Sequence, residues 1–208
     1  IEPGPRPMPQ SLTVVLPAFN EAERIGPALD ELFQFLADAA NVGPVAGLPP
    51  KVDVLVVDDG SRDGTASLVA NRAEAQPGTR DSPAPRLRLV RAKHAGKGAA
   101  VRTGMLAASG ELVIFTDADM ATPPDELPKL VAALRTADVA LGSRIQPDGS
   151  VMRASQPPFR QTLGRIFHAL ASVWVVGPVA DTQCGFKGFT RDAALDIFAE
   201  QQVTSIVF

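Results

Sequence analysis

The chain has 208 residues, of which 45% are hydrophobic and 21% charged, and its formal net charge is −3 at pH 7. This composition is typical of a globular protein with one substantial core, and the charge gives no electrostatic case for nucleic-acid binding. The single cysteine, Cys184, excludes an internal disulfide and favours the cytosol without fixing the compartment.

Residues 1–10 carry four prolines and no apolar core, so they predict a disordered or extended tail and not a signal peptide. The chain does not begin with Met, and we expect it to be an incomplete gene product. Residues 11–208 are predicted to form one domain that is incomplete at its carboxyl end.

In chain order, apolar runs alternate with helical spacing. We predict alternating strands and helices. The strands are Leu12–Leu16 (ended by Pro17), Val52–Val57, Arg86–Val90, Glu111–Thr116, Val139–Leu141 and Gly185–Phe189. The helices that follow them in turn are Ala28–Leu36, Thr65–Ala75 (capped by Asp63), one from near Gly98 to a C-cap at Ser109-Gly110, Asp125–Arg135, Phe159–Val176 and Asp192–Glu200. Loops are predicted at 43–50, 76–85 and 145–158. The alternation predicts an α/β fold with a doubly wound, mostly parallel sheet.

The longest apolar stretch, Ile166–Val179, is too short and too interrupted to span a membrane. It predicts a buried helix. The alternative is a helix lying at a membrane surface, with Arg160 and Arg165 at its approach.

Polar or charged residues follow each of the first five strands, with glycine or proline among or beside them. They are Pro17-Ala18-Phe19-Asn20-Glu21, Asp58-Asp59-Gly60-Ser61, Lys93-His94-Ala95-Gly96-Lys97-Gly98, Asp117-Ala118-Asp119 and Gly142-Ser143-Arg144. We expect all five sets at one edge of the sheet, where ligands of such folds bind. Mg²⁺ and Mn²⁺ favour one or two carboxylates together with substrate phosphates, so Asp117 and Asp119 are the candidate metal ligands.

These motifs and their order resemble the family 2 glycosyltransferases of the GT-A fold, and within them the polyprenyl-phosphate (dolichyl-phosphate) sugar synthases. Asp181-Thr182-Gln183-Cys184-Gly185-Phe186-Lys187 is most similar to the dolichyl-phosphate glucosyltransferases. The resemblance covers roughly residues 11–200. It implies a nucleotide-sugar donor, with UDP-glucose favoured over GDP-mannose, and a metal-dependent transfer to a polyprenyl phosphate.

The resemblance implies a role for each motif residue at the donor. Asp119 would bind the Mg²⁺ or Mn²⁺ ion, and Asp117 would support the ribose or the metal. Asp59 and Glu21 would contact the nucleotide, Asp58 would brace the loop, and Pro17, Ala18 and Ala118 would line the donor pocket. Lys97 between two glycines would bind phosphate, and Gln183 and Lys187 would lie near the donor.

Plainer alternatives to these roles remain: a turn-forming Asp59, a Glu21 that only faces a helix dipole, a capping turn at Gly96, and packing roles for Gln183 and Lys187. His94 is predicted to be a surface or loop residue and not a metal ligand.

At the acceptor, Arg144 and Arg160 would bind the lipid phosphate, because a guanidinium matches phosphate oxygens; either could instead be a solvated charge. The implied mechanism is a single displacement with inversion, without a strong general base. It would take place in the cytoplasm at the inner face of a membrane. The sequence leaves the oligomeric state open.

Two departures narrow the resemblance. Phe19 lacks the hydroxyl often found at its position, and no Gln-x-x-Arg-Trp motif of the processive synthases is present. Three alternatives remain: the same fold acting on a soluble acceptor, a sugar-nucleotide nucleotidyltransferase and a non-catalytic binding module. The first strand lacks the basic glycine-rich loop of the second alternative, and retention of both Asp117 and Asp119 speaks against the third.

Overall fold

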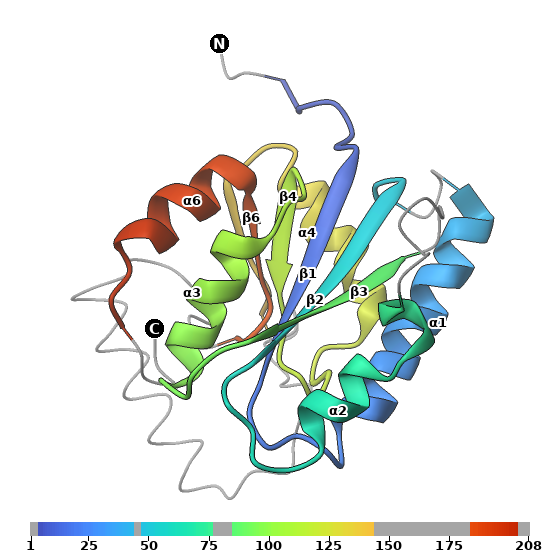
Figure 1. Cartoon of the computed structure of the whole chain (residues 1–208). Coiled ribbons are helices and arrows are strands. Elements are labelled where there is room, and N and C mark those ends of the chain that lie inside the picture. Colours follow the sequence, from blue (N-terminus) through green and yellow to red (C-terminus); the bar gives the residue numbers. More distant parts are fainter. Residues whose placement is uncertain (1–3, 44–46, 77–84, 144–183, 204–208) are drawn as a thin grey trace, which may run out of the picture. The chain divides into compact units, whose positions relative to one another are not determined.

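The computed structural model describes residues 4–43, 47–76, 85–143 and 184–203, and the statements below concern these residues (Figure 1). Contacts group the chain into a larger unit, Ile1–Ala140 with Phe186–Phe208, and a smaller unit, Leu141–Gly185. The predicted helix Phe159–Val176, the 145–158 loop and the stretch Ile166–Val179 lie outside the described residues. So do Arg144, Arg160 and Gln183.

The described strands form one six-stranded sheet in the order β3-β2-β1-β4-β6-β5. Its strands are β1 (Ser11–Ala18), β2 (Lys51–Asp58), β3 (Arg86–Arg91), β4 (Leu112–Phe115), β5 (Val139–Leu141) and β6 (Lys187–Thr190). β1 pairs in parallel with both β2 and β4, β2 pairs in parallel with β3, and β6 runs antiparallel to β4. The mostly parallel sheet is therefore confirmed.

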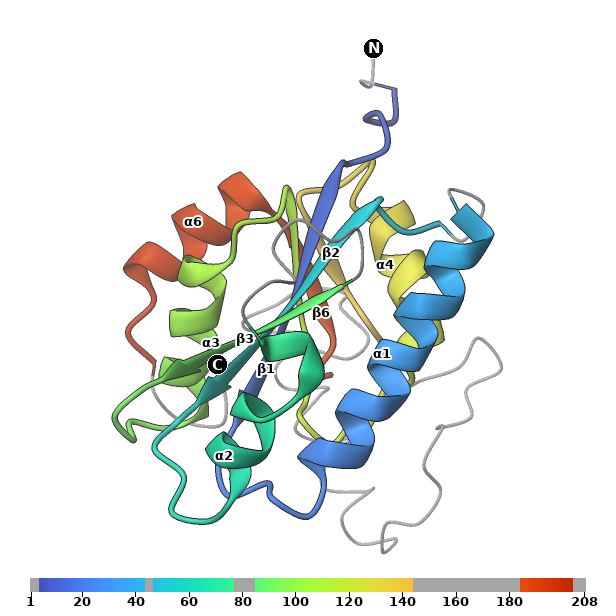
Figure 2. The ribbon, with the colours of Figure 1, turned by 45° about the vertical axis from the view of Figure 1, so that its right-hand side comes forward.

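Helices lie on both faces of this sheet, as a doubly wound fold requires (Figure 2). α3 (Lys97–Ala107) and α6 (Arg191–Glu200) lie on one face, and α1 (Ile25–Val42), α2 (Thr65–Ala70) and α4 (Leu127–Ala133) lie on the other. Two 3-10 turns, η2 (Ala73–Ala75) and η4 (Pro124–Glu126), follow α2 and precede α4.

Strands β1, β2 and β4 are buried along almost their whole length, because helices cover both of their faces. The α3 face of the sheet packs Val15, Leu55 and Phe115 against Val101 and Met105. On the other face, α1 buries an apolar stripe made of Ile25, Ala28, Leu29, Leu32, Phe33 and Leu36. Helix spacing in the sequence predicts this stripe correctly.

Close approach of α3 to the sheet depends on Gly104. A Cβ atom at this position would lie 2.3 Å from Cγ1 of Val15 and 3.0 Å from Cγ2 of Val57. The helix therefore rests directly on β1 and β2, which fixes where the first residue of α3, Lys97, emerges at the edge of the sheet.

Several predicted boundaries are wrong. α1 runs from Ile25 to Val42, beyond the predicted Ala28–Leu36 at both ends, and β6 runs from Lys187 to Thr190 in place of Gly185–Phe189. Three further differences have a clear physical reason. Pro17 lies inside β1, where its missing N–H is tolerated because pairing with β4 ends at Val15. α3 ends at Ala107 with Ala108 as its C-cap, and Gly110 serves another purpose, since a Cβ there would lie 2.6 Å from the Thr13 nitrogen. The predicted helix 65–75 is interrupted after Ala70 and resumes as η2.

Residues 4–9 contain no helix or strand, yet Arg6 is attached to the end of α4. Its guanidinium donates to the carbonyl oxygens of Leu134 (3.2 Å) and Ala137 (2.9 Å) and pairs with Asp138 (2.6 Å). Among the described residues, no helix is both long enough and apolar enough to cross a membrane.

Candidate functional site

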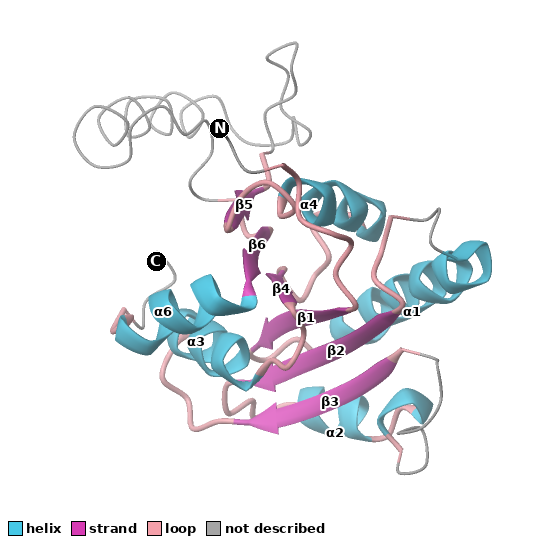
Figure 3. Cartoon of the chain, turned by 90° about the horizontal axis from the view of Figure 1, so that it is seen from above, coloured by secondary structure: helices cyan, strands magenta, loops and turns pink. Residues whose placement is uncertain are grey.

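The carboxyl ends of β1, β2, β3 and β4 lie at one edge of the sheet, because these four strands run in parallel (Figure 3). From β1 the chain continues to β2 on one side of the sheet, whereas from β4 it continues to β5 on the other side. The strand order therefore reverses between the neighbouring strands β1 and β4. Ligands of doubly wound folds bind at such a switch point. The motif after β5 is not tested, since Arg144 lies outside the described residues.

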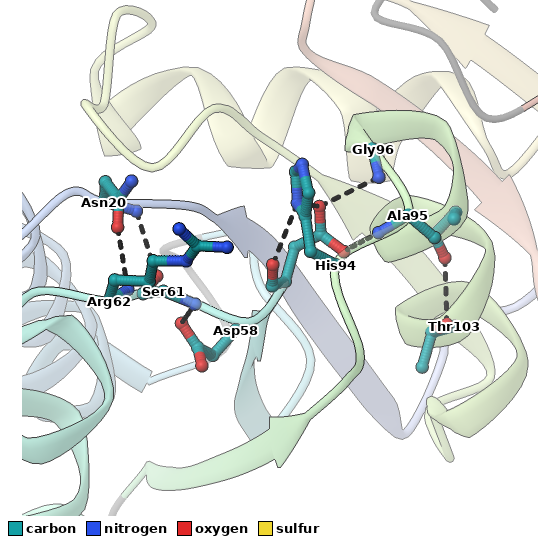
Figure 4. A network of polar contacts seen from close by, with 10 residues as sticks. Asn20, Asp58, Ser61, Arg62, His94, Ala95, Gly96 and Thr103 are labelled. Atoms are coloured by element: carbon teal, nitrogen blue, oxygen red, sulfur yellow. Dashed lines mark hydrogen bonds and ion pairs between the residues drawn. The ribbon is translucent and has the colours of Figure 1, made fainter.

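The loops that follow β1 and β2 are fastened to each other by side-chain hydrogen bonds (Figure 4). Asn20 adopts a left-handed backbone conformation, with φ of 55°, which asparagine tolerates better than most residues. Its backbone N–H donates to the Ser61 hydroxyl (2.9 Å), and its side-chain oxygen accepts from the Arg62 N–H (2.9 Å). The two loops therefore act as one rigid rim.

Asp63 and Thr65 extend this rim. The Glu21 N–H donates to the Thr65 hydroxyl (2.8 Å), and the Ala22 N–H donates to the Asp63 carboxylate (3.1 Å). Hydrogen bonds from the Thr65 hydroxyl and backbone N–H lower the pKa of Asp63 below its usual value. Asp63 accepts from Thr65, the first residue of α2, but Gly64 occupies the N-cap position and α2 has no side-chain cap bond, so the predicted cap at Asp63 is wrong.

Asp59 is the most buried carboxylate at this edge, with 3% of its side chain exposed. One of its oxygens accepts from the Ala95 N–H (2.9 Å), and the other accepts from the Gly96 N–H (3.0 Å) and lies 2.8 Å from Nδ1 of His94. Its neighbour Asp58 accepts from the Ser61 N–H (3.3 Å), so it braces the loop as predicted.

Lys97 links β3 to β4. It is the first residue of α3, after Gly96 at φ of 100°, and its ammonium group pairs with the Asp117 carboxylate. Both side chains are about one-third exposed. Asp119, two residues beyond Asp117 in the chain, is exposed, and one of its oxygens accepts from the Ala121 N–H (3.1 Å).

Several predicted site residues contact one another or the loops at this edge, and others make different contacts. Asp59 contacts the segment after β3, and Lys97 contacts Asp117, which follows β4. The Glu21 carboxylate lies 2.8 Å from Nε of Arg24 on the surface turn before α1. The apolar residues expected to line the donor pocket, Pro17, Ala18 and Ala118, are buried, whereas Lys187 in β6 has its ammonium group 5.8 Å from the centre of the Phe115 ring.

Sequence reasoning missed the roles of His94 and Phe19. Their rings are stacked, with centroids 4.1 Å apart and an interplanar angle of 17°. His94 lies in a loop, as predicted, but it also bonds the buried Asp59. The only signal in the sequence is that Phe19 directly follows β1 and His94 lies three residues beyond the end of β3, at the same edge.

The candidate metal ligands fit a site that obtains most of its ligands from the substrate. Within the described part of the chain, no three His, Cys, Asp or Glu side chains gather closely enough to hold an ion by themselves. Asp119 offers an exposed carboxylate and Asp117 a second one close by in the chain, which is the donor set that Mg²⁺ or Mn²⁺ uses when substrate phosphates complete the coordination.

The sheet order and the strand-end position of these residues define a doubly wound α/β domain that would bind its ligand at the switch point. The Glycosyl transferase family 2 profile matches residues 13–198, and the chain belongs to that family. A dolichyl-phosphate beta-glucosyltransferase of Trichomonas vaginalis is 40% identical over 92% of this chain, and that of Homo sapiens is 31% identical over 96%. The chain spans 55% and 60% of these two relatives.

Solved structures agree on the fold. The mannosyltransferase PcManGT from Pyrobaculum calidifontis, solved in complex with GDP-Man and Mn²⁺, is 26% identical with a TM-score of 0.56, and the match covers 91% of this chain and 47% of that one. Mannosyl-3-phosphoglycerate synthase from Rubrobacter xylanophilus gives a TM-score of 0.60 at 19% identity, over 88% of this chain and 54% of that one.

Proposed function

We propose that residues 11–208 form the catalytic domain of an inverting glycosyltransferase that moves a hexose, glucose from UDP-glucose by preference, to a polyprenyl phosphate such as dolichyl phosphate. The observation that carries this proposal is the Lys97–Asp117 pair at the switch point of the sheet, with the exposed Asp119 two residues further along the chain. The names of the relatives support the acceptor and the sugar.

The donor diphosphate would bind at the start of α3. Lys97 supplies a positive charge there, and the first N–H groups of an eleven-residue helix point in the same direction. Asp117 orients the Lys97 ammonium group. Glu21, Asp59, Pro17, Ala18 and Ala118 belong to the same proposed donor region, together with Gln183 outside the described residues.

Asp119, with Asp117 nearby, would hold a Mg²⁺ or Mn²⁺ ion. A bound ion of this kind neutralises negative charge on a leaving diphosphate. The mannosyltransferase from Pyrobaculum calidifontis, solved in complex with GDP-Man and Mn²⁺, supports a bound metal in this fold.

Transfer would proceed in one displacement. An ionised acceptor phosphate oxygen forms a bond to the anomeric carbon while the bond from that carbon to the nucleoside diphosphate breaks, and the nucleoside diphosphate departs. The nucleophile is already deprotonated at pH 7, so positioning and charge neutralisation account for catalysis. Arg144 and Arg160 are the proposed acceptor-phosphate residues, and a lipid acceptor would place the enzyme at the cytoplasmic face of a membrane.

Calorimetric titration of UDP-glucose and GDP-mannose, each with and without Mn²⁺, tests the donor site. We expect Mn²⁺-dependent binding of UDP-glucose. Binding of GDP-mannose alone would change the proposed sugar, and binding of neither would contradict the donor site.

A transfer assay tests the reaction and the acceptor. We expect Asp119→Asn to lower Mn²⁺-dependent transfer to polyprenyl phosphate by on the order of a hundredfold, because charge neutralisation at the diphosphate is lost. The matched control is Asp125→Asn, which changes an exposed aspartate in η4. Equal transfer by the two variants would refute the role of Asp119, and transfer to 3-phosphoglycerate but not to the lipid would favour a soluble acceptor.

A further inference from the structure

His94 has contacts that a solvated loop histidine would not need. Its Nδ1 lies 2.8 Å from Oδ2 of Asp59 and 3.1 Å from the backbone carbonyl oxygen of Asp59 (Figure 4). Both partners are acceptors, so Nδ1 must carry the proton, whatever the state of the other ring nitrogen.

Asp59 depends on this proton. Its carboxylate is almost completely buried, and a buried charge is stable only when donors surround it. All three of its side-chain donors, His94 Nδ1 and the N–H groups of Ala95 and Gly96, come from three consecutive residues. Segment 94–96, immediately before Lys97, therefore wraps around the carboxylate and is bound to it by hydrogen bonds.

The backbone of the same segment packs tightly against the loop that follows β2. Gly60 has φ of 72°, and a Cβ atom there would lie 2.9 Å from the backbone nitrogen of His94. The segment is thus held from two sides, by the buried carboxylate of Asp59 and by the backbone at Gly60.

We propose that His94 is a positioning residue for donor binding. Its Nδ1–H bond to Asp59 holds segment 94–96 in the shape that aims Lys97 and the start of α3 at the donor diphosphate; this role rests on the proposed function. The hydrogen bond, and not the ring stack on Phe19, carries the effect. The stack is half solvated, with 55% of the His94 side chain and 40% of Phe19 exposed, whereas the bond satisfies a buried charge.

Two substitutions separate the bond from the ring. His94→Asn keeps an N–H donor at the position of Nδ1, because both nitrogens are two bonds from Cβ, but it removes the ring. His94→Phe keeps a ring to stack on Phe19 but removes the donor. Lys93→Ala is the matched control, since it changes the exposed neighbouring residue, which has no described contact with Asp59.

Amide hydrogen exchange of Ala95 and Gly96 in the donor-free protein is the first measurement. We expect exchange at least about tenfold faster in His94→Phe, since loss of a donor weakens the whole cluster around the carboxylate, and near-native exchange in His94→Asn. Donor kinetics follow: His94→Phe should raise KM for the donor by about tenfold with kcat changed less than about threefold, the pattern of lost ground-state binding. His94→Asn should restore KM.

The reverse result, with His94→Phe native-like and His94→Asn defective, would overturn the proposal in favour of the stack. Native values for both variants would show that His94 has no such role. Exchange needs no donor, so it distinguishes this proposal from the proposed function: a native protein that binds no nucleotide sugar refutes the latter, and the exchange contrast still decides whether the His94 bond holds the segment.

Discussion

At the residue scale, sequence order predicts which side chains reach the strand-end edge but not what they bond there. Lys97 and Asp117 were predicted at one site, and they form an ion pair. The predicted contact of Asp59 with the nucleotide stays a prediction, and the sequence did not reveal that its carboxylate accepts from N–H groups of segment 94–96. A buried carboxylate needs hydrogen-bond donors around it. Which donors it finds depends on the conformation of the surrounding loops, which residue types alone do not specify.

The lowered pKa of Asp63 predicts a pH-dependent contribution to stability. A carboxylate whose pKa is depressed by folding stabilises the protein above its unfolded pKa of about 3.8, and the contribution is lost as pH falls through the folded pKa. We therefore expect Asp63→Ala to lower the free energy of unfolding at pH 7 and to differ less from the native protein at low pH. Urea unfolding at pH 7 and at about pH 3 measures this difference. A gap that stayed constant between the two pH values would mean that the Asp63 charge is not involved.

At the element scale, long apolar runs and helical stripes predicted the elements correctly, whereas glycine and proline residues gave wrong positions for their ends. Gly110 resembles a helix C-cap in the sequence, but glycine is needed there because the backbone of Thr13 passes within contact distance. Pro17 resembles a strand terminator, but it lies beyond the last pair between β1 and β4. In both cases a neighbouring strand from a distant part of the sequence decided the outcome.

Helix packing on the sheet gives a prediction with a built-in control. Gly104→Ala should lower the free energy of unfolding by about 1–3 kcal/mol, because the new methyl group would overlap Val15. Gly26→Ala adds the same methyl group to α1, where it would meet no atom within 4 Å beyond the adjoining chain and helix backbone, so stability should be unchanged or rise by up to about 1 kcal/mol. Chemical denaturation of both variants makes the comparison, and equal effects would contradict the close α3 contact.

At the scale of the whole molecule, the order of motifs along the chain predicted the fold correctly, including its doubly wound sheet. The reversed direction of β6 was not predicted, because four residues, Lys187–Thr190, contain no signal of strand direction. The acceptor side rests on Arg144 and Arg160, which stay predictions.

Thermal unfolding tests the proposed metal site, because Mn²⁺ and the nucleotide-sugar donor should raise Tm only when both are present. The protein supplies few metal ligands by itself, so Mn²⁺ alone should change Tm little, and the donor in the presence of EDTA should do the same. Together, at about 100 times Kd, they should stabilise the fold by about 2.7 kcal/mol and raise Tm by roughly 5–10 °C. A full shift with Mn²⁺ alone would reveal a protein-only metal site and contradict the one proposed.

The arginine content of β3 has a consequence for association between copies of the chain. β3 is the last strand at its end of the described sheet, and an edge strand can pair with a strand of another molecule. Arg88 and Arg91 are exposed on it, so two such edges would bring like charges together. We expect this repulsion to oppose edge-to-edge aggregation at low ionic strength and to weaken as salt screens the guanidinium groups.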